Sequence, residues 1–184
     1  EVSDKYPNLA TYNKKSEKLR IYIVQAISLR YHEYSSCKKG DLLEIYDTIY
    51  HANEKDWKPQ VFEEHWKEMS KYVDKAIQKL ENLKDGFGVI KEGYVPFMPV
   101  IPILAALIKE SEIRENQRDC NKKIEHWYWS IVFNDAYSSS VDSQLTSDYK
   151  DLKEWFSDDT KIPKNVMDAR NSIDSLRLRE VGKL

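Results

Sequence analysis

Glycine and proline are scarce in this sequence, where together they make up only 11 of 184 residues. Hairpins and tight turns depend on these two residue types, so the scarcity argues against a protein built from strands and turns. Apolar residues make up 41% and charged residues 33% of the chain, a balance typical of a folded domain and not of a disordered one. The composition therefore predicts an all-α fold, and the length suits a single domain.

Cysteines, long apolar runs and an apolar leader are scarce or missing as well. The two cysteines, Cys37 and Cys120, are too few for a disulfide framework, which predicts a reducing compartment such as the cytoplasm. The longest apolar run, 95–108, is interrupted by prolines and is shorter than the roughly 20 residues that span a membrane. No secretory leader is visible, so no membrane partner is expected. Because the sequence starts at Glu1 and not at methionine, we expect a piece of a longer protein.

A strong charge of one sign is also absent, since the formal net charge is −2. The chain as a whole is therefore not a basic nucleic-acid-binding protein. Residues 1–40 nevertheless carry eight Lys and Arg against four Asp and Glu, and 41–85 carry seven against eleven. Such faces usually keep helices in solution, and the alternative is contact with DNA or RNA. The candidates for nucleic-acid contacts are Lys14, Lys15, Lys18, Lys122 and Lys123.

Apolar residues recur at helical spacing along most of the chain and predict an irregular bundle of six or seven helices around a long central helix. The expected helices cover 14–34, a short stretch after Asp41, 59–85, 102–108, 118–134, a stretch opened by the serines at 138–140, and 165–178. We expect one helical domain over 1–184, with its core at about 14–156 and a linker at 157–164.

The longest expected helix, 59–85, has the most regular pattern. Pro59 suits the first turn of a helix, and Gly86 is a candidate for the C-terminal cap. The apolar stripe follows steps of four and three, at Phe62, Trp66, Met69, Val73, Ala76, Leu80 and Leu83. Because this stripe includes tryptophan and alanine, we predict the central helix of a bundle; the alternative is a two-chain coiled coil.

Side-chain patterns that carry chemistry are largely missing. The histidines form no His-Glu-x-x-His motif, and Asp47 with His51 would supply only two ligands for a metal. Gly86-Phe87-Gly88 lacks the further glycines of a phosphate-binding loop. Arg118 and His126 are too far apart for the motif of helical ribonucleases. The residues themselves therefore indicate no catalytic site, no metal site and no cofactor in this chain.

An ordered set of segments, by contrast, resembles a known family. The segments are 95–98, 101–108, the aromatic stretch 124–133, 136–139 and 144–148. In this order they resemble the helical part of the GmrSD-type restriction proteins, which are modification-dependent (type IV) nucleases of phage defence. The positions that match the family's motifs are Trp127, Trp129, Tyr137, Ser138 and Asp148. On spacing alone, Trp127 and Tyr128 belong to the core, and Trp129 points elsewhere.

The resemblance implies a non-catalytic role for this chain. The family's nucleotide-hydrolysing Asp-Gly-Gln-Gln-Arg motif and its His-containing nuclease motif are both absent, and the arginine that precedes Tyr-Ser is Ala136 here. It implies a helical module that couples a nucleotide-hydrolysing domain to a nuclease domain, with those domains and DNA as partners. Two alternatives stay open. One is an interaction or homo-oligomerisation module that uses the 59–85 stripe or the 165–178 helix, and the other is a nucleic-acid-binding helical domain.

Overall fold

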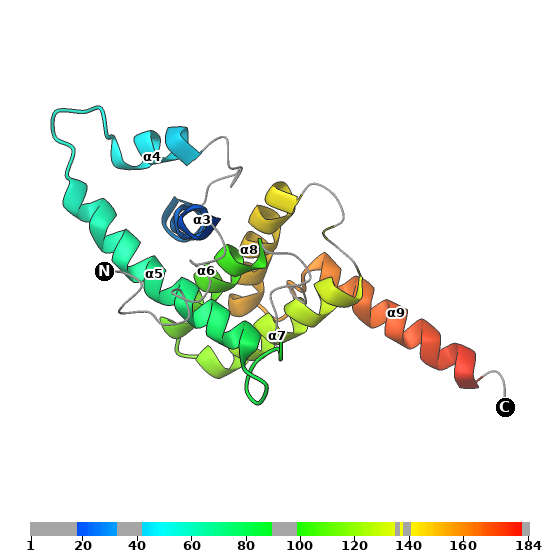
Figure 1. Cartoon of the computed structure of the whole chain (residues 1–184). Coiled ribbons are helices and arrows are strands. Elements are labelled where there is room, and N and C mark those ends of the chain that lie inside the picture. Colours follow the sequence, from blue (N-terminus) through cyan, green and yellow to red (C-terminus); the bar gives the residue numbers. More distant parts are fainter. Residues whose placement is uncertain (1–17, 33–41, 90–98, 135–136, 138–140, 182–184) are drawn as a thin grey trace.

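The computed structural model describes residues 18–32, 42–89, 99–134, 137 and 141–181. Every regular element in these parts of the chain is a helix, which confirms the predicted all-α fold with seven helices (Figure 1). The helices are α3 (Lys18–His32), α4 (Leu42–Tyr50), α5 (Pro59–Glu81), α6 (Val100–Glu112), α7 (Gln117–Phe133), α8 (Val141–Ser157) and α9 (Lys164–Val181).

Helix α6 forms the centre of the bundle, although it is not the longest helix. Its apolar residues Val100, Ile101, Ile103, Leu104 and Leu107 are all fully buried. It packs against α3 and α5 on one side and against α7 and α8 on the other. Burying one such side chain stabilises a fold by roughly 1.5–3 kcal/mol, so a helix buried all round is a main contributor to the core.

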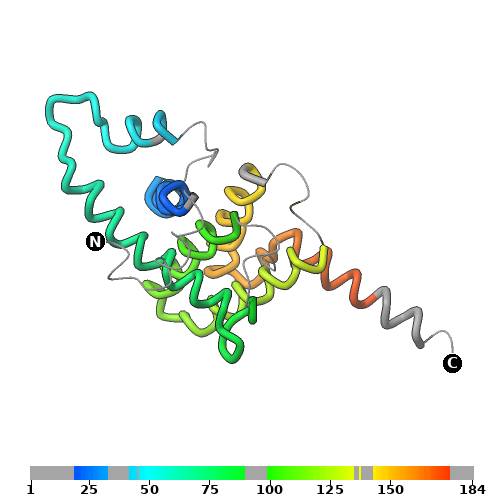
Figure 2. The backbone as a smooth tube through the Cα atoms, viewed as in Figure 1, coloured from blue at the N-terminus to red at the C-terminus, as the bar shows by residue number. Residues whose placement is uncertain are grey.

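The apolar stripe of helix α5 packs against other helices of the same chain. Met69, Val73, Ala76 and Leu80 are fully buried, and the helix packs against α3, α4 and α6. The prediction of a bundle helix is therefore confirmed, and the stripe is not available for a two-chain coiled coil. Figure 2 shows α3 nearly end-on, close to α4, α5 and α6, all of which it contacts.

The end of α5 differs from the prediction. The helix ends at Glu81, and Leu83, which was assigned to the stripe, is 74% exposed. The physical reason is Asn82, whose side-chain oxygen accepts the backbone N–H groups of the next turn at 2.8 and 2.9 Å. The chain then folds back so closely that a Cβ on Gly86 would lie 2.1 Å from the carbonyl oxygen of Lys79. Position 86 therefore requires glycine because of close backbone approach, but the residue that caps the helix is Asn82 and not Gly86 as predicted.

The C-terminal helices follow the predicted faces. The buried residues are Ile124, Trp127, Tyr128 and Ile131 on α7, and Leu145, Tyr149, Leu152 and Phe156 on α8. The connection at 158–163 returns the chain so that α9 packs on α7 through Val166 and Ala169. Helix α9 then leaves the body of the bundle (Figure 1), and Ile173 is 47% exposed.

Candidate functional site

Three of the five family-motif positions meet at one buried carboxylate, Asp148 on α8. The indole Nε1–H of Trp127 on α7 donates to Asp148 Oδ2 at 2.8 Å, and the hydroxyl of Tyr137 donates to the same oxygen. The side-chain amide of Asn165 on α9 lies 3.2 Å from both carboxylate oxygens. Asp148 is 4% exposed. We call these four residues the Asp148 cluster.

Burial governs the electrostatics of the Asp148 cluster. Loss of water around the carboxylate raises the pKa of Asp148, and the hydrogen bonds from Tyr137 and Trp127 oppose this rise only in part. Burial and the neighbouring carboxylate together raise the pKa of Tyr137, which stays a neutral donor. The described partners of Asp148 are thus neutral donors, one from each of α7 and α9 and one from the segment before α8.

The Asp148 cluster ties secondary structure together and offers little access to a substrate. Hydrogen bonds to a charged acceptor contribute about 1.5–3 kcal/mol each, so the cluster holds α7, α8 and α9 in a defined arrangement. Asn165 was not predicted, because it lies 17 positions beyond Asp148 on a separate helix and belongs to no motif. Only the fold brings the two side chains together.

The other two motif positions do not join the cluster. Trp129 is 42% exposed and packs edge-to-face on Tyr128 and Phe87, with ring centroids 5.3 and 6.0 Å away. It therefore lies on a different face of α7 from Trp127, as its spacing predicts. Ser138 lies outside the described residues.

The basic positions proposed for nucleic acid behave differently from one another. Lys122 is exposed, whereas Lys123 is buried and donates to Asp159 at 2.6 Å, to the Trp155 carbonyl at 2.7 Å and lies 2.8 Å from Asp119. Burial lowers the pKa of Lys123, but the two carboxylates outweigh it and the net shift is upward. Its charge is already neutralised, so the expectation that Lys123 contacts nucleic acid is wrong.

The remaining basic positions lie at the edge of the described chain. Lys14 and Lys15 are outside the described residues, and Lys18 is the first residue of α3, with its side chain not described. Asp47 and His51, which would supply two ligands for a metal, are both exposed, and His51 Nδ1 lies 3.1 Å from Glu54 Oε1. Within the described ranges, no group of three or more His, Cys, Asp or Glu side chains could hold a metal ion.

A second polar cluster, which sequence reasoning missed, joins α3, α4 and α5. Tyr31 stacks on His65 with ring centroids 3.7 Å apart, and the Tyr50 hydroxyl lies 2.8 Å from His65 Nδ1. The Tyr31 hydroxyl donates to Glu68, which also binds Lys109. Burial, and then the nearby His65, lower the pKa of His32 to about 4; burial also lowers the pKa of His65. Both histidines are therefore neutral at pH 7.

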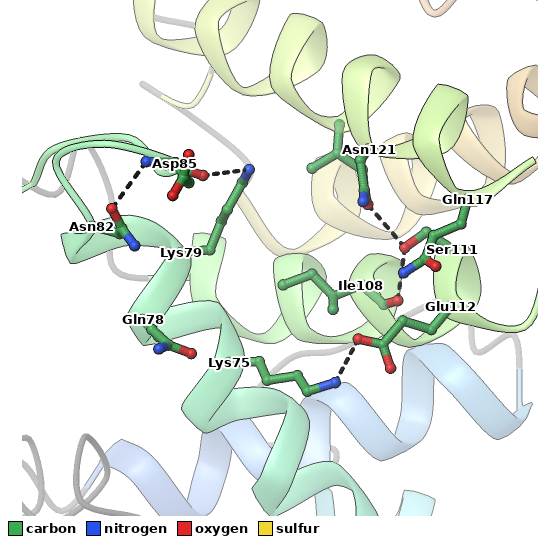
Figure 3. A pocket seen from close by; sticks show the side chains of 11 residues that line it. Lys75, Gln78, Lys79, Asn82, Asp85, Ile108, Ser111, Glu112, Gln117 and Asn121 are labelled. Atoms are coloured by element: carbon green, nitrogen blue, oxygen red, sulfur yellow. Dashed lines mark hydrogen bonds and ion pairs between the residues drawn. The ribbon is translucent and has the colours of Figure 1, made fainter.

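A cavity of about 330 Å³ lies where α5, α6 and α7 meet (Figure 3). Its wall is polar: Lys75 Nζ lies 2.5 Å from Glu112 Oε1, and Lys79 Nζ donates to the Asp85 carbonyl at 2.9 Å. The Ser111 hydroxyl donates to the Ile108 carbonyl at 2.9 Å and lies 3.1 Å from Asn121 Oδ1. No sequence pattern pointed to these residues, because three helices contribute them separately.

Comparison with known proteins finds a relative that is itself uncharacterized. No family model matches the chain, and no solved structure matches it significantly. None of the described helices is long and apolar enough to cross a bilayer. The chain is similar to the uncharacterized protein MJ0686 of Methanocaldococcus jannaschii, with 27% identity over 161 residues. The match covers 85% of this chain but only 24% of that protein, so the chain spans about a quarter of its relative's length.

Proposed function

We propose that this chain is a non-catalytic helical module of a larger, GmrSD-like restriction protein. In this proposal it couples a nucleotide-hydrolysing domain to a nuclease domain, both of which lie outside the chain. The observation that carries the proposal is the Asp148 cluster, in which three of the five family-motif residues bind one another in the interior. The partners of these motif residues are protein groups and not a substrate. Residues of this kind connect helices, which suits a module that transmits a conformational change between domains.

Two further features support a coupling role. The relative that the chain resembles is about four times as long as the matched region, so this helical unit occurs within a larger protein. Helix α9 is held at its first turn by Asn165 and then extends away from the body (Figure 1). Asn165 connects α9 to Asp148 and thereby to α7 and α8, so a displacement of α9 would change the contacts of the Asp148 cluster.

The proposal is tested with the isolated chain and with the parent protein. The purified chain is expected to hydrolyse neither ATP nor GTP and to leave both modified and unmodified DNA intact. In the parent protein, Asp148→Asn is expected to preserve nucleotide hydrolysis and to reduce nucleotide-dependent DNA cleavage at least tenfold. Asp174→Asn, on the exposed side of α9, is the matched control and should leave both activities unchanged. Turnover by the isolated chain that survives repeated purification would contradict the proposal.

A second candidate is an interaction or homo-oligomerisation module. The observation that favours it is α9, whose Met167 and Ile173 are 44% and 47% exposed. Apolar side chains on a projecting helix are typical of a surface that packs against another helix. Light scattering at high protein concentration separates the two candidates, since a monomer would exclude self-association through α9.

A further inference from the structure

We propose that the cavity between α5, α6 and α7 binds a small zwitterion of the α-amino-acid class. This site is separate from the Asp148 cluster, so the inference does not depend on the proposed function. The cavity volume of about 330 Å³ lies at the lower end of ligand-binding pockets, which span roughly 300–1,000 Å³. A ligand of this size is a small metabolite and not a large cofactor.

The cationic wall of the cavity comes from α5. Lys75 and Lys79 are four residues apart and therefore project from the same face of the helix, toward the cavity (Figure 3). An ammonium group has three N–H donors. The described oxygen partners use one donor of Lys75, through Glu112, and two of Lys79, through the Asp85 carbonyl and Glu125. A ligand carboxylate beside Lys75 would take the donors of that ammonium group that remain, whereas the Lys79 ammonium group lies at the other end of the cavity, beside Asp85 (Figure 3).

One acidic residue of the lining lies beside each lysine: Glu112 of α6 beside Lys75, and Asp85 of the turn after α5 beside Lys79 (Figure 3). Glu112 accepts hydrogen bonds from Lys75 and from the Tyr72 hydroxyl, the latter at 2.9 Å. These two groups lower the pKa of Glu112 despite its burial, so it is ionised at neutral pH. The Asp85 carboxylate also lines the cavity. The charged lining residues are thus two cations and two anions, an arrangement that favours a zwitterion over a polyanion such as a nucleotide.

Carboxamide side chains also line the cavity, and they indicate the kind of side chain that the ligand carries. Gln78 comes from α5, and Gln117 and Asn121 come from the first turns of α7. The Ser111 hydroxyl lies 3.1 Å from Asn121 Oδ1, so the oxygen of this amide faces protein and its nitrogen is the donor for a ligand. Amide groups donate and accept at once, so they match a ligand side chain that does the same, such as the carboxamide of glutamine.

The test is a titration of the folded chain with L-glutamine, followed by calorimetry and by amide chemical shifts. Two analogues serve as probes: glutaramic acid lacks the ammonium group, and 4-aminobutanamide lacks the carboxylate. We expect L-glutamine to bind and each analogue to bind at least tenfold more weakly, because each has lost one charge-assisted contact. Shift changes should map to α5, α6 and α7 around the cavity.

Three outcomes would overturn the inference. The first is that an analogue binds as tightly as L-glutamine, and the second is that inorganic phosphate binds more tightly than L-glutamine. The third is that none of L-glutamine, L-asparagine and L-serine binds at about 10 mM, a concentration ten times a Kd of about 1 mM.

Substitutions locate the site. Lys75→Met keeps the apolar stem and removes the charge, and Gln117→Ala shortens an exposed side chain; each should raise the Kd about tenfold. Lys67→Met is the matched control, because Lys67 lies on the same helix, is 74% exposed and pairs with Glu63 away from the cavity. Circular dichroism confirms that all three variants fold. If Lys67→Met weakens binding as much as Lys75→Met, the cavity is not the site.

Discussion

Replacing Asp148 by leucine tests whether the Asp148 cluster holds the C-terminal helices together. The substitution removes the acceptor for the Trp127 indole and the Tyr137 hydroxyl, which are 0% and 8% exposed, and for the half-buried Asn165 amide. A buried donor left without a partner costs about 1–3 kcal/mol. Part of this loss is offset, because the raised pKa of Asp148 shows that its charged form is destabilised by burial. We expect a net loss of about 2–4 kcal/mol in the free energy of unfolding.

The assay is urea unfolding followed by tryptophan fluorescence. A loss of this size lowers the midpoint by about 1–2 M urea with an unchanged slope. Asp174→Leu, at an exposed position on α9, is the control and should stay within about 0.5 kcal/mol of the wild type. Trp127→Phe in both backgrounds closes a double-mutant cycle, which should show coupling of about 1 kcal/mol or more. A loss below about 1 kcal/mol for Asp148→Leu, together with no coupling, would refute the reasoning.

Four further predictions concern other parts of the chain. Gly86→Ala should destabilise the fold by about 2–4 kcal/mol, because the added Cβ would lie 2.1 Å from the Lys79 carbonyl oxygen. Gly88→Ala, at φ +70°, should destabilise it by only about 1 kcal/mol. Thermal unfolding of the two variants tests this difference. The unfolded chain protonates His32 near pH 6.5 and the folded chain only near pH 4, so stability should fall by about 1 kcal/mol between pH 7 and 5, after allowance for solvent screening. His32→Gln should remove that part of the pH dependence, and an unchanged profile would show that other groups cause it. Binding of duplex DNA, if the basic N-terminal positions contact phosphates, should weaken steeply with salt, and a flat salt dependence would exclude such contacts. Lys123→Met should lower the urea midpoint, because it leaves Asp119 and Asp159 without their shared cation.

Much of the fold could be predicted from the sequence, because apolar periodicity marks a buried helix face directly. The apolar stripe of α5 was predicted correctly as far as Leu80, which is fully buried. The prediction was wrong at Leu83, where the apolar spacing continues by chance although the helix has already ended. The side chain of Asn82 accepts the next backbone N–H groups and turns the chain before Leu83. The central position of α6 was harder to predict, since it depends on how many helices pack around it and not on its own length.

The polar sites were predicted less completely. Lys123 lies four residues before Trp127 and therefore on the same buried face of the helix. The spacing thus indicated burial, but the charge of the lysine led to the prediction of an exposed side chain. The partnership of Asp148 with Asn165 has no local signal, because the two residues come from helices whose packing only the fold determines. The same reason applies to the cavity, whose Lys75, Glu112 and Gln117 come from three helices.

The Trp127–Asp148 bond also gives the molecule a built-in spectroscopic reporter. The indole proton of Trp127 is held by a carboxylate in an interior that water does not reach, so its exchange with deuterium requires the helices around it to separate. The indole of Trp129, two residues away and 42% exposed, is expected to exchange without any such opening. The contrast between these two proton resonances would therefore measure how often α8 and α9 detach from α7, independently of events in the N-terminal half of the bundle.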